Sequence, residues 1–119
     1  MNITKKLFIA ATTVTVMTTA SYATSNADMI KEGEKIFNTK KIGNCLACHA
    51  VEGKNIDNPG SLGPKLVGLA FWDSKDLYNI VYDPYETRSK ISAMPSFGKN
   101  GWLTDHQIKA VVAYLKTIK

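Results

Sequence analysis

Two cysteines and a histidine are grouped within five residues of this sequence, as Cys45-Leu46-Ala47-Cys48-His49, and the chain has no other cysteine. Two thiols three residues apart on one helical turn can face the same edge of a porphyrin, where each closes a thioether to a vinyl group. The next residue, His49, is then carried under the ring, and its imidazole can ligate the iron on the proximal face. The pattern predicts one covalently attached haem c, held by Cys45 and Cys48, with His49 as an axial ligand.

Three other chemistries use similar residues. A structural zinc site needs four protein ligands, and only His106 could join the two cysteines and His49. A thioredoxin-like redox pair is expected beside a βαβ pattern, and the sequence shows no convincing strand. A disulfide across so small a loop would add little stability and would leave His49 without a role. Haem attachment is the interpretation that uses all three residues.

The second ligand of the iron separates electron transfer from oxygen or peroxide chemistry. Met94 precedes Pro95 in a segment without periodicity, where extended backbone can bring its thioether across the distal face. Met29 lies on a predicted helix whose apolar face needs filling, and His106 follows the N-cap of a polar helical turn. Met94 is therefore the predicted second axial ligand. An open distal site, as in a haem enzyme or gas sensor, is the alternative.

The first 23 residues have the pattern of a secretory signal peptide. Lys5 and Lys6 form a positive start, residues 7–20 are apolar and rich in threonine, and a small-residue cleavage site ends at Ala23. An uncleaved membrane anchor is the alternative, but residues 7–20 fall short of the ~20 residues that span a bilayer. We expect cleavage after Ala23, export to the periplasm, and one small domain at residues 24–119 with no attachment to the membrane.

The charge of the chain does not favour a nucleic-acid partner. The formal net charge is +5, two units of which belong to Lys5 and Lys6, and Arg88 is the only arginine. Five lysines flank the predicted haem residues, namely Lys40, Lys41, Lys54, Lys65 and Lys99. These lysines could surround an exposed haem edge and steer a redox partner. The alternative is that they are ordinary solvated side chains.

Apolar periodicity predicts an all-α domain of about four helices. A first amphipathic helix is expected over residues 27–37, and a helical turn over residues 45–50. A third helix would begin at a cap on Asp73 or Ser74, run to about Tyr82 and be stopped by Pro84. A capping box of Thr104 and Gln107 opens the last helix, which is expected to run close to Lys119.

Long loops are expected between these helices. Residues 53–64 and 83–101 are rich in glycine and proline and show no sustained period. A domain of this size buries little of its own surface, so a covalently held porphyrin is expected to form part of the core. Haem is therefore expected to be needed for folding.

Several motifs occur in the order seen in the small His/Met cytochromes c. They are Gly33 with Phe37, C-x-x-C-H, the run Gly63 to Gly68, Met94-Pro95, and the run Val111 to Leu115. The resemblance spans nearly all of residues 24–119 and implies the small cytochrome c fold, in which the first and last helices cross at Gly33, Phe37 and Tyr114. It also implies that the Pro64 carbonyl accepts the Nδ1 hydrogen of His49 and so fixes its tautomer. A simple turn proline is the alternative.

Three longer segments, residues 43–50, 59–64 and 94–104, resemble the SoxX family. SoxX proteins are monohaem subunits of the periplasmic SoxAX complex, an enzyme of L-cysteine S-thiosulfotransferase type that joins thiosulfate oxidatively to a cysteine of the carrier SoxYZ. The resemblance implies a SoxA-type partner that carries the thiol chemistry and a small soluble cytochrome that accepts the electrons. The chain is short for the family, so a further small subunit could supply contacts that longer members make themselves.

By this resemblance the chain is an electron-transfer subunit that is not catalytic alone. The sequence agrees, because it holds no cysteine nucleophile outside the haem motif and no convincing Ser/His/acid set; Asp105 and His106 are only sequence neighbours on a helix. A free diffusible cytochrome c, which shuttles electrons in a respiratory chain, is the alternative.

Overall fold

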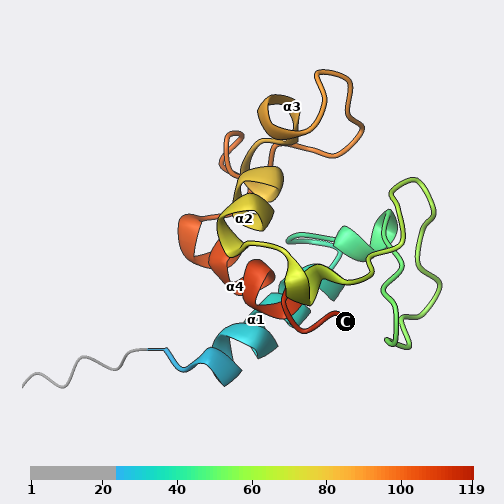
Figure 1. Ribbon diagram of the computed structural model, residues 1–119, viewed down its shortest axis with the longest axis vertical. Helices are drawn as coiled ribbons and strands as arrows, with labels where there is room; N and C mark the ends of the chain where they lie inside the picture. Colours follow the sequence, from blue (N-terminus) through green and yellow to red (C-terminus); the bar gives the residue numbers. More distant parts are fainter. Residues whose placement is uncertain (1–23) are drawn as a thin grey trace, which may run out of the picture.

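The computed structural model describes residues 24–119, and the predicted signal peptide at residues 1–23 lies outside the described residues. The described chain contains four α-helices, α1 (Asn26–Asn38), α2 (Ser74–Tyr82), α3 (Pro84–Thr87) and α4 (Asp105–Leu115), and two 3₁₀ turns, η1 (Cys45–Ala47) and η2 (Leu69–Phe71) (Figure 1). Within these residues the β-structure is limited to one parallel bridge between Val51 and Leu66. None of the described helices has the length and apolar character needed to cross a membrane. The predicted all-α fold is confirmed.

The first and last helices cross where α1 has a glycine. A Cβ atom on Gly33 would lie 1.9 Å from the carbonyl oxygen of Ala110 and 2.9 Å from the Cβ of Tyr114, so only glycine allows this approach. One turn further along α1, the rings of Phe37 and Tyr114 pack edge to face with their centroids 5.3 Å apart. The structure thus contains the helix crossing that the family resemblance implies.

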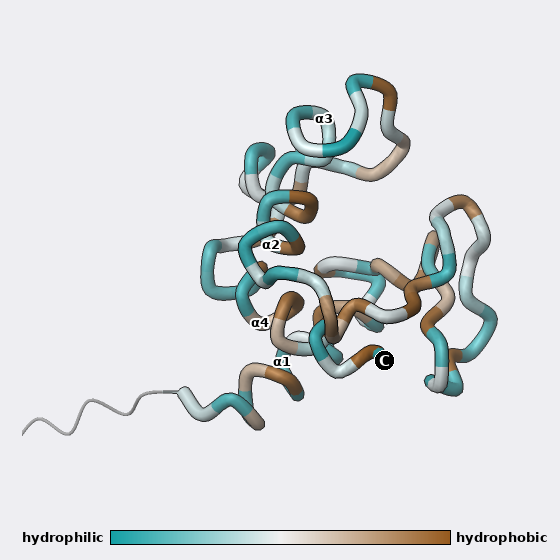
Figure 2. The backbone as a smooth tube through the Cα atoms, in the orientation of Figure 1, coloured by the Kyte–Doolittle hydropathy of each residue, from teal (hydrophilic) through white to brown (hydrophobic). Residues whose placement is uncertain are grey.

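The hydrophobic core lies around α4. This helix buries six side chains, namely Ile108, Ala110, Val111, Val112, Tyr114 and Leu115. Helix α1 covers one side of it with Ile36 and Phe37, and α2 contacts it with the face that carries Leu77 and Val81. Hydrophobic and hydrophilic stretches alternate along α1, α2 and α4 (Figure 2), as expected for helices with one buried face.

Side-chain caps fix where the helices begin. The Lys75 amide donates to Asp73 Oδ1 at 2.8 Å, which starts α2 at Ser74. The predicted capping box of α4 is confirmed: the Gln107 amide donates to Thr104 Oγ1 at 3.1 Å, and the Thr104 amide donates to Gln107 Oε1 at 2.9 Å. These caps are local in sequence, which is why the starts of both helices are predictable.

The last helix ends earlier than predicted. Helix α4 stops at Leu115, well before Lys119, because the amides of Thr117 and Ile118 turn back to carbonyls three residues before them, at 2.9 and 3.0 Å. This tighter turn carries Ile118 into the core, where it is 1% exposed. The apolar periodicity of the sequence extends to Ile118, but a turn and not the helix brings this residue into the core.

The segment predicted as a loop from residue 83 starts with a short helix. Pro84 ends α2, as predicted, but it also occupies the first position of α3, where a proline needs no amide hydrogen. Asp83 is both the C-cap of α2 and the N-cap of α3. Its Oδ1 accepts a hydrogen bond from the Tyr85 amide at 3.2 Å. The prediction of an uninterrupted loop over residues 83–101 is therefore wrong at its first residues.

We predict that Gly33→Ala lowers the free energy of unfolding by about 1–3 kcal/mol, because the new methyl group would meet the Ala110 carbonyl and push the helices apart. Chemical denaturation followed by circular dichroism measures this change. Lys31→Ala on the exposed side of α1 is the matched control and should change stability by less than about 0.5 kcal/mol. Equal stability of both variants would show that the crossing is not tight.

Candidate functional site

Cys45, Cys48 and His49 lie on a tight turn that follows α1. The turn begins at Asn44, whose backbone is left-handed (φ 52°, ψ 37°), and continues through η1. The amides of Cys48 and His49 both donate to the Cys45 carbonyl, at 3.1 and 3.0 Å. Because Cys48 leaves helical geometry (φ −120°), the regular turn ends at Ala47 and is shorter than the predicted segment 45–50.

Both thiols of this turn are free. Burial raises the pKa of Cys45 to about 12. A thiol with such a pKa is neutral at physiological pH and is a poor nucleophile, unlike the activated cysteine of a redox enzyme. The environment of Cys45 therefore does not favour a thioredoxin-like role.

His49 is held by the backbone of the loop that follows. Its Nδ1 atom lies 2.8 Å from the carbonyl oxygen of Pro64, which can only accept a hydrogen bond. The contact requires a hydrogen on Nδ1, so the neutral imidazole presents an unprotonated Nε2 with a lone pair. This is the tautomer that a metal-binding histidine needs, and a backbone carbonyl is a common partner for its other nitrogen.

Two glycines allow the same loop to lie directly on the cysteine turn. A Cβ atom on Gly63 would lie 2.4–2.8 Å from three atoms of the His49 ring, and one on Gly60 would lie 1.7 Å from the Ala47 carbonyl oxygen. The Gly60 amide donates to the Leu46 carbonyl at 2.9 Å, and the Gly63 amide donates to the Cys48 carbonyl at 2.8 Å. These bonds join two segments that are distant in the sequence, so no local pattern identifies the role of Gly60.

Met94 borders the same cavity as the cysteine turn. It is half-buried and packs against the core, and its amide donates to Ser92 Oγ at 3.1 Å. The four side chains that the sequence singled out as haem ligands or attachment points, Cys45, Cys48, His49 and Met94, all line one cavity of about 690 Å³.

The cavity suits a large apolar group that carries a metal. Its volume falls within the range of about 300–1,000 Å³ that is usual for cofactor pockets. Most of its lining is apolar, with contributions from α2, from η2 and from the loops, including Leu66, Leu69, Leu77, Ile80, Phe97 and Trp102. Two thiols, an imidazole and a thioether are the donors that hold haem c in His/Met cytochromes.

Two polar side chains at the cavity, Asn44 and Arg88, have surroundings that the sequence did not reveal. Asn44 also borders it, and its Oδ1 atom is buried without a hydrogen-bond partner among residues 24–119. A polar partner inside the cavity would satisfy this atom. The Arg88 guanidinium lies 5.3 Å from the ring centre of Trp72, and both residues line the cavity, so this contact ties the end of α3 to the segment after η2.

His106 is not part of this site. Its Nε2 lies 2.8 Å from Glu32 Oε2, so it joins α4 to α1. It is exposed, as predicted, but it has a partner that the sequence did not suggest. No group of three His, Cys, Asp or Glu side chains in the described part of the chain is arranged to hold a metal ion. His106 therefore does not complete a zinc site with the two cysteines.

Three of the five lysines that flank the predicted haem residues have partners on the protein. Lys65 pairs with Glu52, and Lys99 Nζ lies 2.9 Å from Asp83 Oδ2. Lys54 lies over the ring of Tyr114, with Nζ 5.7 Å from the ring centre. Of the five lysines, Lys40 alone lines the cavity.

Comparisons with known proteins point to the same chemistry. Residues 28–115 match the family model described as "Cytochrome C oxidase, cbb3-type, subunit III". An uncharacterized lipoprotein of Aquifex aeolicus (strain VF5) is 37% identical over 90 residues, which cover 71% of this chain and 43% of that protein. The chain thus spans less than half the length of this relative.

Two solved structures have a similar fold. The crystal structure of SoxXA from P. pantotrophus superposes with a TM-score of 0.65 and 30% identity, over 74% of this chain and 80% of the other. The c-type cytochrome SorU from Sinorhizobium meliloti superposes with a TM-score of 0.57 and 28% identity, over 77% of this chain and 92% of the other. The chain therefore belongs to the family of the cbb3-type cytochrome c oxidase subunit III, and it is a SoxX-like c-type cytochrome, a class of protein that holds haem covalently.

Proposed function

We propose that this protein is the monohaem X subunit of a periplasmic SoxAX complex and carries electrons during thiosulfate oxidation. Its similarity to SoxXA, over 80% of that chain, supports the assignment. The segments 43–50, 59–64 and 94–104, which resemble the SoxX family, include the cysteine turn, the loop that holds His49, and Met94. A single C-x-x-C-H motif supports one haem.

The observation that carries an electron-transfer role is the pair of potential axial ligands on one cavity, His49 and Met94. In the proposed site, Cys45 and Cys48 attach the haem, and bound haem supplies one-electron redox chemistry. The Pro64 carbonyl keeps the hydrogen of His49 on Nδ1, so that Nε2 is available as a ligand. Haem held by both His49 and Met94 would have no open position for a substrate, so it would serve electron transfer.

Asp105 and His106, which are neighbours in the sequence, contact different side chains. Asp105 accepts hydrogen bonds from Tyr78 at 2.9 Å and from Lys109 at 2.8 Å, whereas His106 contacts Glu32. The two residues are therefore not paired as a catalytic dyad. In the proposed complex a SoxA-type subunit carries the thiol chemistry on SoxYZ, this chain takes up the released electrons, and a small soluble cytochrome accepts them.

Export to the periplasm is part of the proposal. The signal-peptide pattern of residues 1–23 supports it. The relative from Aquifex aeolicus is named as a lipoprotein, which is a class of exported protein, and this agrees with an extracytoplasmic location.

A free electron shuttle is the second candidate. The cytochrome c motifs fit it equally well, and SorU, which this chain matches over 92% of its length, is a c-type cytochrome. The two candidates differ in whether the protein has a fixed partner.

We predict that Met94→Ala lowers the reduction potential and removes the near-infrared methionine-to-iron band of the ferric protein. A thioether ligand raises the potential of haem, and axial ligands span about 0.8 V across haem proteins, so a decrease on the order of 0.1 V is expected. Spectroelectrochemical titration measures both quantities. Met29→Ala on α1 is the matched control and should keep the band. An unchanged band in Met94→Ala would exclude Met94 as the ligand.

Replacing both attachment residues should prevent folding. We expect a Cys45→Ala, Cys48→Ala double variant to lose covalent haem and to fail to accumulate as folded protein, because a small domain buries little surface without the porphyrin. Haem staining after denaturing electrophoresis and circular dichroism of the purified chain measure the two effects. A folded and colourless variant would mean that the haem is not part of the core.

The SoxAX assignment predicts a partner in fixed ratio. Affinity capture of the tagged protein from the periplasm should recover a SoxA-type cytochrome with one copy per copy of this chain, as judged by haem content and mass spectrometry. Addition of thiosulfate and SoxYZ should then reduce the haem of this chain within the complex. Recovery of an isolated monomer would favour the free shuttle instead.

A further inference from the structure

Met94 lies in a segment with little regular structure of its own. Beyond α3, residues 88–101 form neither helix nor strand, and the Met94 amide bonds to Ser92 within the same loop. A loop with few fixed contacts opens readily, which would carry the thioether away from the cavity. The contacts between this loop and the helices therefore decide where Met94 lies.

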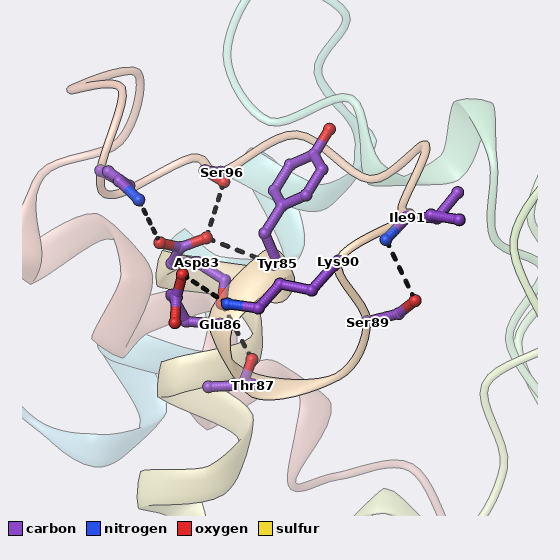
Figure 3. A network of polar contacts seen from close by, with 9 residues as sticks. Asp83, Tyr85, Glu86, Thr87, Ser89, Lys90, Ile91 and Ser96 are labelled. Carbon is purple, nitrogen blue, oxygen red and sulfur yellow. Dashed lines mark hydrogen bonds and ion pairs between the residues drawn. The ribbon is translucent and has the colours of Figure 1, made fainter.

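The strongest of these contacts converge on Asp83, at the junction of α2 and α3. Its side chain is 10% exposed. Asp83 Oδ1 accepts a hydrogen bond from Ser96 Oγ at 3.0 Å, and Oδ2 lies 2.9 Å from Lys99 Nζ. Figure 3 shows one carboxylate oxygen of Asp83, Oδ1, joined both to Ser96 and to the backbone at Tyr85. One carboxylate thus links the helical junction to two residues that follow Met94.

Separation of these groups would be costly. The hydrogen bond and charge of Lys99 hold the pKa of Asp83 below its usual range, so the carboxylate is ionised at neutral pH. Ser96 is 4% exposed, and its hydroxyl donates to this carboxylate. If the loop moved away, a buried charge and a buried hydroxyl would both lose a partner, and hydrogen bonds to charged groups contribute more than neutral ones.

We propose that Asp83 is a positioning residue for Met94, which through Ser96 holds the Met94 segment against the α2–α3 junction and keeps the thioether on the cavity. Only Pro95 lies between Met94 and Ser96, and its fixed φ transmits the position of Ser96 to Met94. The inference rests on the proposed role of Met94 as an axial ligand.

A second set of contacts should allow variants of this link to fold. The amides of Gly98 and Lys99 both donate to the Tyr82 carbonyl, at 3.2 and 3.1 Å, and those of Trp102 and Leu103 donate to the Phe97 carbonyl, at 2.9 and 3.0 Å. These bonds hold the end of the loop independently of Asp83. Loss of the Asp83–Ser96 contact would therefore loosen the part of the loop that carries Met94.

Two substitutions separate positioning from helix capping. Asp83→Asn weakens the whole cluster, including the bond to the Tyr85 amide that starts α3. Ser96→Ala removes only the link to the Met94 segment, and Ser96→Thr restores a hydroxyl. Glu86→Gln is the matched control, because it weakens an exposed ion pair with Lys90 (2.8 Å) near the start of the same loop (Figure 3) and leaves the contacts of Asp83 with Ser96 and Lys99 in place.

The experiment uses the ferric holo-protein and imidazole as the probe. At saturating imidazole, the rate at which imidazole nitrogen replaces the methionine sulfur is limited by the opening of the Met94 segment. The disappearance of the near-infrared band measures this rate. We expect Ser96→Ala and Asp83→Asn to raise this limiting rate about tenfold or more, as the loss of a hydrogen bond to a charged group implies. Ser96→Thr and Glu86→Gln should stay within about twofold of the parent protein.

The outcomes distinguish this inference from the proposed ligand itself. A parent protein without the near-infrared band would refute the role of Met94, and with it the positioning role. A parent with the band but an unchanged rate in Ser96→Ala would refute only the positioning role. Should Asp83→Asn fail to fold, Ser96→Ala and its Thr counterpart decide the question. A tenfold increase of the limiting rate in Glu86→Gln as well would assign the effect to the α2–α3 junction in general. That result would refute the specific role of the Asp83–Ser96 hydrogen bond.

Discussion

Backbone can touch backbone between α1 and α4 only because residue 33 has no side chain. That contact brings α1 close against α4, and the cysteine turn follows soon after the end of α1. The Asn44 amide donates to the Thr39 carbonyl at 3.1 Å, and Gly43 lies so close to Ile36 that a Cβ atom there would be 2.8 Å from its carbonyl oxygen. The position of the cysteine turn therefore depends on how α1 is held at this crossing. Site geometry and fold stability are coupled through a few close backbone contacts.

The walls of the cavity are made mostly of irregular chain, and each wall is fixed in its own way. The loop beside His49 is held by backbone hydrogen bonds, with glycines where the approach is closest. The Met94 side is held by buried side-chain contacts at the α2–α3 junction. Backbone contacts of the first kind tolerate few substitutions at the glycines, whereas side-chain contacts of the second kind can be tuned by single replacements. Single substitutions are thus expected to alter the Met94 side of the cavity more readily than the His49 side.

The features that the sequence predicted well are those determined locally. The capping box at Thr104, the cap at Asp73 and the apolar period of the last helix each depend on residues within one or two turns. The C-x-x-C-H pattern is local too, and Met94 stood out because few other ligands remain in residues 24–119. Features determined by distant segments were missed. The Asp83 cluster, the contact of Gly60 with the cysteine turn, and the His106–Glu32 pair all depend on where the chain returns in space, which spacing does not encode.

The parallel bridge between Val51 and Leu66 closes the loop beside His49 at its base, where the amides of Glu52 and Leu66 donate to carbonyls across the gap at 2.9 and 2.8 Å. Residues 53–58 lie beyond this closure and are largely exposed, although Ile56 packs against the core and Lys54 lies over Tyr114, so the exposed residues 57–58 are the free part of this tip. Lengthening a closed loop costs little, about 0.6 kcal/mol for each doubling. Inserted residues at this tip would leave Gly60 to Pro64 in place beneath the imidazole. The tip is thus where relatives could differ in length, or where a foreign peptide could be grafted, without disturbing His49.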